Sequence, residues 1–190
     1  MDAKIAAREG PCLVLLDTLA VSPAEQPRPD RIADAKTTVT PLGDFASDAF
    51  WRDFRFVRRL GGGTFGETYL AHPERSPHVL LVLKIPRDGT IMERRRNIEF
   101  LRSEANLLSK LFHPGIVRFR NFVYKPDTEK GSKAYLAMDY AEGGSLDDRL
   151  KRHSKAGTVT CASEIARIIL SILQTLEYLH LRRVLHLDIK

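Results

Sequence analysis

A glycine-rich segment at residues 60–69, with the sequence LGGGTFGETY, constrains the fold of this chain more than any other feature. Upstream of it, Phe54, Phe56 and Leu60 alternate with charged residues, which predicts a half-buried strand, and residues 68–71 predict a second strand. The glycines therefore lie in a hairpin turn. Because glycine has no Cβ atom, the backbone N–H groups of such a turn can close over a small anion. Taken alone, the pattern also fits a plain glycine-rich hairpin.

Lys84 lies inside the apolar segment 79–85, which is bounded by prolines. A segment this apolar predicts a strand that is buried on both faces. A buried lysine needs an anionic partner, since it otherwise loses its proton. A phosphate under the glycine turn or a carboxylate from elsewhere would serve. The alternative is a lysine near a strand end that extends its ammonium group to water.

Residues 92–112 predict a helix whose apolar side includes an acidic residue. Glu104 falls in a row next to the main apolar row, whereas Glu99 faces outward among arginines. An inward glutamate and an inward lysine are each costly alone and compatible as a pair, so we expect Glu104 to bind Lys84. The main row contains Ile98, Leu101, Ala105, Leu108 and Phe112, and the adjacent row contains Phe100, Glu104, Leu107 and Leu111.

These features together resemble the eukaryotic-like Ser/Thr protein kinase family. The signature of that family includes a glycine loop, a strand lysine with its helix glutamate, and a His-x-Asp catalytic loop. The resemblance runs from about Phe50 to the last residue. It continues through HPGIV at 113–117, through YLAMDYAEGGSL at 135–146, which resembles the hinge, and through HLDIK at 186–190, which resembles the start of the catalytic loop.

The resemblance implies an α+β, protein-kinase-like fold. A five-stranded antiparallel N-lobe sheet with one large helix would occupy residues 50–140, with its last two strands at 116–124 and 133–138. Residues 141–190 would form the hinge and the first helices of an incomplete helical C-lobe. One helix would start at Ser145 with a capping box, and a longer apolar one at about residue 160. Residues 1–49 would be an N-terminal extension with a proline-rich linker.

By the same resemblance, the glycine turn holds the ATP phosphates through its backbone, with Phe65 at the tip of the loop. Lys84 would contact the α- and β-phosphates, and Glu104 would orient Lys84. Read without the upstream motifs, the hinge segment is only a strand end and a helix cap. The turn comprises Gly61, Gly62, Gly63, Thr64, Phe65 and Gly66, and the adenine and ribose positions are Thr68, Val82, Met138, Asp139, Ala141 and Ser145.

Two residues at the end of the sequence carry the implied transfer chemistry. Asp188 would accept the proton of the substrate hydroxyl, and Lys190 would neutralise the γ-phosphate, a pattern that resembles Ser/Thr kinases. Leu187 stands where the family has an arginine that pairs with a phosphorylated activation loop. The Mg²⁺ ligands of the family would lie past the chain end, so no metal ligand is expected among these residues.

The expected function is ATP- and Mg²⁺-dependent phosphoryl transfer to a protein serine or threonine, with the chain truncated at the catalytic loop and inactive alone. The alternative is a non-catalytic, kinase-like regulatory module that binds a nucleotide, or a partner on its exposed C-lobe helix. A nucleic-acid binder would rest only on the net charge of +6, and the scattered arginines favour a solvated face. No apolar segment is long enough to cross a membrane. The cysteines Cys12 and Cys161 are far apart in the sequence, which fits a reducing compartment, and we expect the protein to be cytoplasmic.

Overall fold

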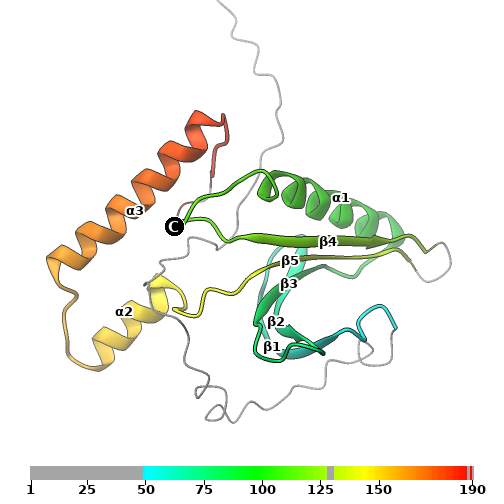
Figure 1. Ribbon diagram of the computed structural model, residues 1–190, viewed down its shortest axis with the longest axis horizontal. Helices are drawn as coiled ribbons and strands as arrows, with labels where there is room; N and C mark the ends of the chain where they lie inside the picture. The colour runs from blue at the N-terminus through cyan, green and yellow to red at the C-terminus, as the bar shows by residue number, and fades with distance from the viewer. Residues whose placement is uncertain (1–48, 128–130, 188, 190) are drawn as a thin grey trace, which may run out of the picture.

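The computed structural model describes residues 49–127, 131–187 and 189. The described part of the chain has the expected α+β arrangement, with one five-stranded antiparallel sheet and three helices (Figure 1). Residues 1–48, most of the expected N-terminal extension, lie outside the described residues. The elements are β1 (Phe54–Gly62), β2 (Gly66–Pro73), β3 (Leu81–Pro86), α1 (Ile91–Leu108), β4 (Phe119–Lys125), β5 (Lys133–Asp139), α2 (Leu146–Lys155) and α3 (Ala162–Leu181).

The sheet has the strand order β1-β2-β3-β5-β4, so the lysine-bearing strand β3 is central. The helix α1 lies along one face of the sheet, and α2 and α3 are grouped beyond the end of β5, on the left in Figure 1. Among the helices of the described residues, none is both long and apolar enough to cross a membrane.

A capping box starts α1, because Thr90 accepts a hydrogen bond from the N–H of Glu93 while the Glu93 carboxylate accepts one from the N–H of Thr90. The bonds that the Glu93 carboxylate accepts from the N–H and the hydroxyl of Thr90 lower the pKa of Glu93. The predicted end of this helix at residue 112 was wrong, because regular helix stops at Leu108. Two tight turns then lead the chain into Pro114, a residue that disfavours helix before it, and Phe112 is 78% exposed.

Two apolar clusters hold the sheet, one on each face. The cluster between α1 and the sheet contains the apolar residues predicted for the inner face of the helix, except Phe100 and Phe112, which are exposed. The cluster on the opposite face is rich in aromatic rings, and Trp51, only 4% exposed, lies 5.7 Å from the Tyr135 ring between centroids. The sequence pattern did not single out Trp51, because it precedes the alternating residues of β1.

The predicted bounds of β3 and β4 also need correction. The strand β3 begins at Leu81, whereas the prediction began at Val79, which is partly exposed. Its side chains alternate between buried and partly buried, so only one of its faces is fully covered. The strand β4 begins at Phe119, because the buried residues Ile116 and Val117 belong to the loop that follows α1. Apolar character predicted burial there, and burial does not require a strand.

The helix α3 contacts the loop between α1 and β4. The Tyr178 hydroxyl accepts a hydrogen bond from the N–H of Phe112 at 2.7 Å, and the Tyr178 ring lies 4.8 Å from the His113 ring between centroids. Thr175 Oγ1 lies 3.4 Å from His113 Nδ1. A Cβ atom on Gly115 would come within 2.0 Å of Thr175 Oγ1, so only glycine fits beside α3 at this position.

Most of the circumference of α3 and much of α2 are solvent-exposed. In α3, only Ile168, Thr175 and Leu179 are buried, and no residue of α2 is buried by the described part of the chain. Within the described residues, α3 therefore presents an apolar surface that no other segment covers. The large apolar residues exposed on α3 are Ile165, Ile169, Leu170, Leu173 and Leu181.

Candidate functional site

The glycine turn joins β1 to β2 as a closed hairpin. The N–H of Gly63 donates to the carbonyl oxygen of Gly66 at 2.9 Å, and the carbonyl oxygen of Phe65 accepts a hydrogen bond from Arg87 at 3.1 Å. A Cβ atom on Gly66 would come within 2.6 Å of the Ile85 carbonyl oxygen, so β2 can approach β3 this closely only with glycine there. The turn is thereby held against the end of the lysine strand. Gly61 and Gly62 end β1, and Thr64 is exposed at the tip.

Lys84 and Glu104 form the expected ion pair. The Lys84 ammonium donates to both carboxylate oxygens of Glu104, at 2.6 and 2.8 Å, and each side chain is only 12% exposed. The strand places Lys84 on the α1 side of the sheet, and the helix period places Glu104 toward the sheet. A buried pair with this geometry satisfies both charges, so the ammonium is held at a fixed position next to the glycine turn.

The cross-strand register places the predicted adenine-side residues in adjacent rows. Thr68 of β2 pairs with Lys84 of β3, and Val82 of β3 pairs with Met138 of β5. Met138 is buried against α1, and Val82 packs against the same cluster. Directly paired residues in a sheet project from the same face. Thr68, Val82 and Met138 therefore lie on the face that carries Lys84, as an adenine pocket beside this lysine requires.

The segment after β5 is anchored by contacts that the sequence analysis did not identify. Asp139 donates its N–H to the Arg118 carbonyl oxygen at 3.0 Å, and its carboxylate accepts hydrogen bonds from Arg120. The Tyr140 hydroxyl accepts a hydrogen bond from Arg58 of β1 at 3.2 Å. The N–H of Asp139 is thus already used, and a nucleotide base would meet the other backbone groups of this segment.

Comparison with known proteins decides the family. The family model of the protein kinase domain matches residues 54–190 of this chain. The chain belongs to the protein kinase family. It is similar to the serine/threonine-protein kinase Nek11 of Mus musculus, with 31% identity over 82% of this chain and 24% of that protein. It is also similar to Aurora kinase C of Mus musculus, with 36% identity over 73% of this chain and 46% of that protein. Aurora kinase A-A of Xenopus laevis is 33% identical over 73% of this chain and 31% of that protein.

This kinase chain thus spans a quarter to a half of the length of these relatives. The sheet with α1 corresponds to the expected kinase N-lobe, and α2 and α3 to the start of the C-lobe. The residues expected to carry transfer, Asp188 and Lys190, lie outside the described residues. Before them, His186 is buried, and Leu187 is 63% exposed with a positive φ of 60°.

Ser145, the position expected near the ribose, caps the N-terminus of α2 in the kinase chain. Its hydroxyl accepts a hydrogen bond from the N–H of Asp148 at 3.0 Å and donates to the Asp148 carboxylate at 2.7 Å. The capping box predicted for the start of this helix is confirmed, with Ser145 as the residue before α2. The bonds that the Asp148 carboxylate accepts from the hydroxyl and the N–H of Ser145 lower the pKa of Asp148. Any contact of the Ser145 hydroxyl with a ribose would compete with the cap.

A hydrogen-bonded network lies at the β2 end of the glycine turn. The Tyr69 hydroxyl donates to the Glu67 carboxylate at 2.5 Å, and Arg59 donates to the same carboxylate at 3.2 Å. The bond from Tyr69 lowers the pKa of Glu67, with a smaller contribution from Arg59. Burial, together with the bond to Glu67, raises the pKa of Tyr69 to about 12. The network ties β1 to β2 just outside the turn.

Replacing Tyr69 by phenylalanine is expected to lower the free energy of unfolding at pH 7 by about 1 kcal/mol, because the variant loses one hydrogen bond to a carboxylate. The folded-state pKa of Glu67 is depressed, so this stabilisation is present above pH 4.5 and is lost as the pH falls through the folded-state pKa. Urea unfolding of both proteins from pH 7 to pH 3 measures the difference. A difference that stayed constant down to pH 3 would contradict the assignment to Glu67.

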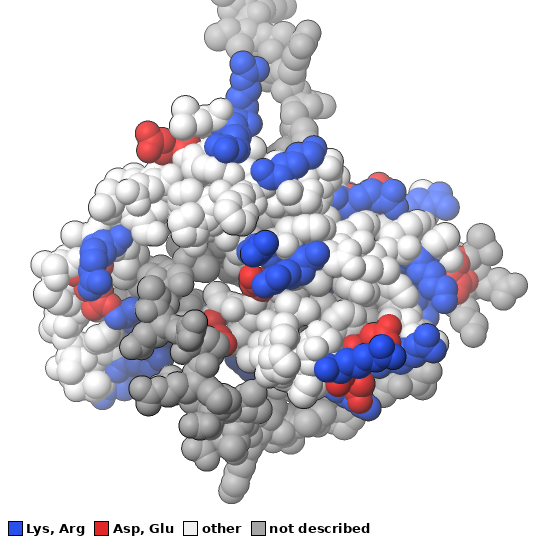
Figure 2. Space-filling model, viewed as in Figure 1, with Lys and Arg blue, Asp and Glu red and all other residues white. Residues whose placement is uncertain are grey.

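The charged side chains on the face drawn in Figure 2 occur in separate groups. Lys and Arg are spread over several elements on this face, and several of them lie beside acidic side chains. Ion pairs among the described residues include Arg55 with Glu74 and Arg94 with Asp88. The described residues also contain no group of three or more His, Cys, Asp or Glu side chains that could hold a metal ion.

Proposed function

We propose that this chain is the ATP-binding part of a serine/threonine protein kinase, which transfers the γ-phosphoryl group of ATP to a protein hydroxyl. The observation that carries the proposal is the Lys84–Glu104 pair, buried between the central strand β3 and α1 next to a closed glycine turn. Each charged group is costly to bury unless it is paired with the other. The pair holds the Lys84 ammonium at the mouth of the glycine turn, where it can bind the phosphates of a nucleotide.

The phosphate end of the nucleotide would lie between the turn and Lys84. Backbone N–H groups of residues 61–66 that the hairpin does not use, such as that of the exposed Thr64, supply donors to phosphate oxygens. Lys84 would bind the α- and β-phosphates while Glu104 keeps the ammonium in place. The adenine would lie along Thr68, Val82 and Met138, with its edge at the backbone of the segment 139–141.

The proposed transfer is an in-line displacement. The hydroxyl oxygen of the substrate forms a bond to the γ-phosphorus, the bond from that phosphorus to the bridging oxygen breaks, and ADP leaves. The hydroxyl proton passes to Asp188, and Lys190 neutralises the γ-phosphate. Mg²⁺ supports such transfer in the family, and the described residues contain no group of three or more His, Cys, Asp or Glu side chains that could hold it.

A phosphoryl-transfer assay tests this proposal. The native protein, isolated from its own cells, is incubated with ATP labelled at the γ-phosphate, Mg²⁺ and a serine/threonine-rich substrate protein, since the 190-residue chain alone is expected to be inactive. We expect label on serine or threonine that is lost in the variant Lys84→Met, with an Asp188→Asn variant as a second negative control. Label on tyrosine, or equal label with Lys84→Met, would contradict the proposal.

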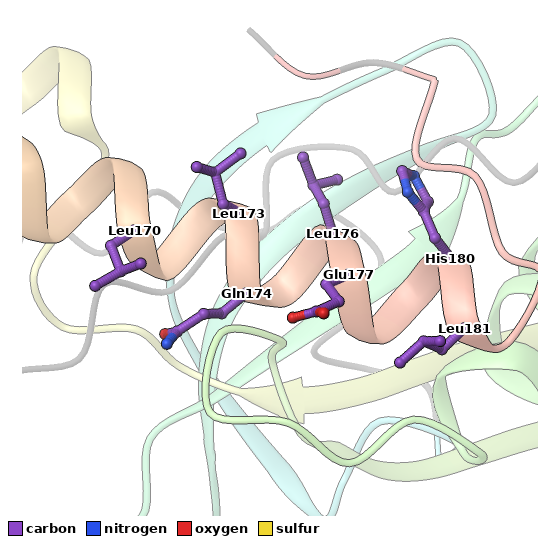
Figure 3. Close-up of a pocket in the computed structure, with 7 residues that line it drawn as sticks. All are labelled: Leu170, Leu173, Gln174, Leu176, Glu177, His180 and Leu181. Atoms are coloured by element: carbon purple, nitrogen blue, oxygen red, sulfur yellow. The ribbon is translucent and has the colours of Figure 1, made fainter.

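A second candidate is a non-catalytic kinase-like module that binds a nucleotide or a partner and regulates another protein. The exposed apolar face of α3 favours it. Along this face runs a shallow depression, which Figure 3 shows between two rows of side chains of the same helix. Saturable ATP binding without any phosphoryl transfer would favour this candidate over the first. The two rows contain Leu173, Leu176 and His180, and Leu170, Gln174, Glu177 and Leu181.

A further inference from the structure

The tip of the glycine turn is in contact with α1 through two aromatic rings. The Phe65 ring lies 4.2 Å from the Phe100 ring between centroids, with an angle of 35° between the planes. The guanidinium carbon of Arg96, one helical turn earlier, lies 5.4 Å from the Phe100 centroid. Phe100 is 41% exposed, so this ring is on the surface, where the burial of a hydrophobic core does not hold it.

Backbone hydrogen bonds hold the same turn from the other side. The Phe65 carbonyl oxygen accepts a bond from the N–H of Arg87, and the Arg87 carbonyl oxygen accepts one from the Asn97 side chain of α1 at 3.1 Å. Asn97 is buried. The turn is thus connected to α1 directly through the Phe65 ring and indirectly through the residue that follows β3.

Phe100 also precedes Glu104 by four residues in α1, and residues with this spacing are neighbours on a helix surface. The contact between Phe65 and Phe100 therefore lies one helical turn from the Lys84–Glu104 pair. A single helix, α1, presents the carboxylate that orients the lysine and the ring that holds the turn. A change in the position of α1 would move both together.

We propose that Phe100 is a positioning residue, which holds the glycine turn closed over the phosphate end of the nucleotide through its contact with Phe65. The proposal rests on the proposed function, because it assumes that phosphates bind at this turn. Phe100 itself contacts no nucleotide. Its effect is confined to the phosphate end, since the adenine-side residues Thr68, Val82 and Met138 lie on strands that the contact does not involve.

The contact can be tested first without any nucleotide. Hydrogen exchange of the full chain, followed by mass spectrometry, reports the amides of Gly63 and Arg87, which the closed turn protects. In Phe100→Ala we expect these amides to exchange about 2- to 10-fold faster, the change that loss of one aromatic pair produces. Phe100→Tyr keeps a ring at the position and should retain the wild-type rates. Unchanged exchange in Phe100→Ala would overturn the proposal.

Tyr124 provides a matched control. It is also 41% exposed and also lies under an arginine, with the guanidinium carbon of Arg102 at 4.7 Å from its centroid, but it belongs to the edge strand β4. Tyr124→Ala should leave the exchange of Gly63 and Arg87 unchanged. Equal acceleration in Tyr124→Ala and Phe100→Ala would show a general loss of stability and would overturn the proposal.

Nucleotide titrations then test the effect on binding. We expect Phe100→Ala to bind ATP about 2- to 10-fold more weakly while its affinity for adenosine stays at the wild-type value. The double variant Phe65→Ala/Phe100→Ala should lose no more affinity than Phe65→Ala alone, because Phe65→Ala already removes the contact with Phe100. Unchanged ATP affinity, or an equal loss for adenosine, would overturn the positioning role.

A wild-type chain that binds no ATP would refute the proposed function and the phosphate role of Phe100 with it. The exchange experiment would still decide whether the contact holds the turn. The failure of the proposed function and the failure of the contact are therefore distinguishable.

Discussion

Replacing Lys84 by methionine is expected to lower the free energy of unfolding by about 1–3 kcal/mol, although methionine packs well in apolar surroundings. The reason is the carboxylate of Glu104, which is 12% exposed and accepts both of its short hydrogen bonds from Lys84. Without the ammonium, this carboxylate keeps its desolvation cost and loses its compensation. Urea unfolding at pH 7 measures the effect through the transition midpoint.

A second variant separates the lost pair from lost packing. In Lys84→Met/Glu104→Met, no charge remains at the site, so we expect the double variant to recover most of the stability lost in the single variant. Lys125, an exposed lysine of β4, gives a control, since Lys125→Met should change the unfolding free energy by no more than about 0.5 kcal/mol. A double variant that is less stable than Lys84→Met would contradict the pairing.

Gly115→Ala is expected to destabilise the protein by about 1–3 kcal/mol, because the new methyl group overpacks a site with no room for it. The Cβ atom would lie 2.0 Å from Oγ1 and 3.2 Å from Cβ of Thr175, which is itself 1% exposed. To relieve the clash, α3 and the loop must move apart. Thermal unfolding followed by circular dichroism measures the loss.

The rescue and the control for this prediction come from the same chain. Thr175→Ala removes the colliding hydroxyl, so Gly115→Ala/Thr175→Ala should be more stable than Gly115→Ala alone. At Gly61, a Cβ atom would meet nothing within 4 Å, and Gly61→Ala should therefore leave the stability nearly unchanged. Equal losses at Gly61 and Gly115, with no rescue, would indicate that α3 does not pack against this loop.

The sequence could predict the parts of the site that depend on local periodicity. The apolar run around Lys84 indicated a buried strand, and the 3.6-residue period placed Glu104 on the inner side of its helix. These two patterns are each local, and the cost of burying either charge alone was enough to pair them across 20 residues. The capping box at Ser145 was equally local, because its partner follows three residues later.

The sequence could not predict contacts between groups that each have other plausible environments. Arg120 and Asp139 are 19 residues apart, and either would be an ordinary surface charge without the β4–β5 register that brings them together. Phe112 and Tyr178, 66 residues apart, meet only because α3 returns to the loop after α1. The helix period also placed Phe112 inside α1, whereas tight turns and the following proline end the helix earlier.

The glycine turn illustrates both sides of this division. Its position between two strands followed from residue types alone. That Phe65 folds back onto Phe100 depends on where α1 lies relative to the turn, which only the packing of the apolar cluster between α1 and the sheet determines. Phe100 was already in the same helical row as Glu104, and this shared row was the only local signal for its location.

Calorimetric titration of ATP into the 190-residue chain tests the central claim most directly, with the folded Lys84→Met variant measured alongside. We predict saturable one-site binding to the wild-type chain and an affinity about 10- to 100-fold lower in the variant, because a charged hydrogen bond to phosphate is lost. A folded wild-type chain that shows no saturable binding, or a variant that binds ATP as tightly as the wild type, would contradict the account.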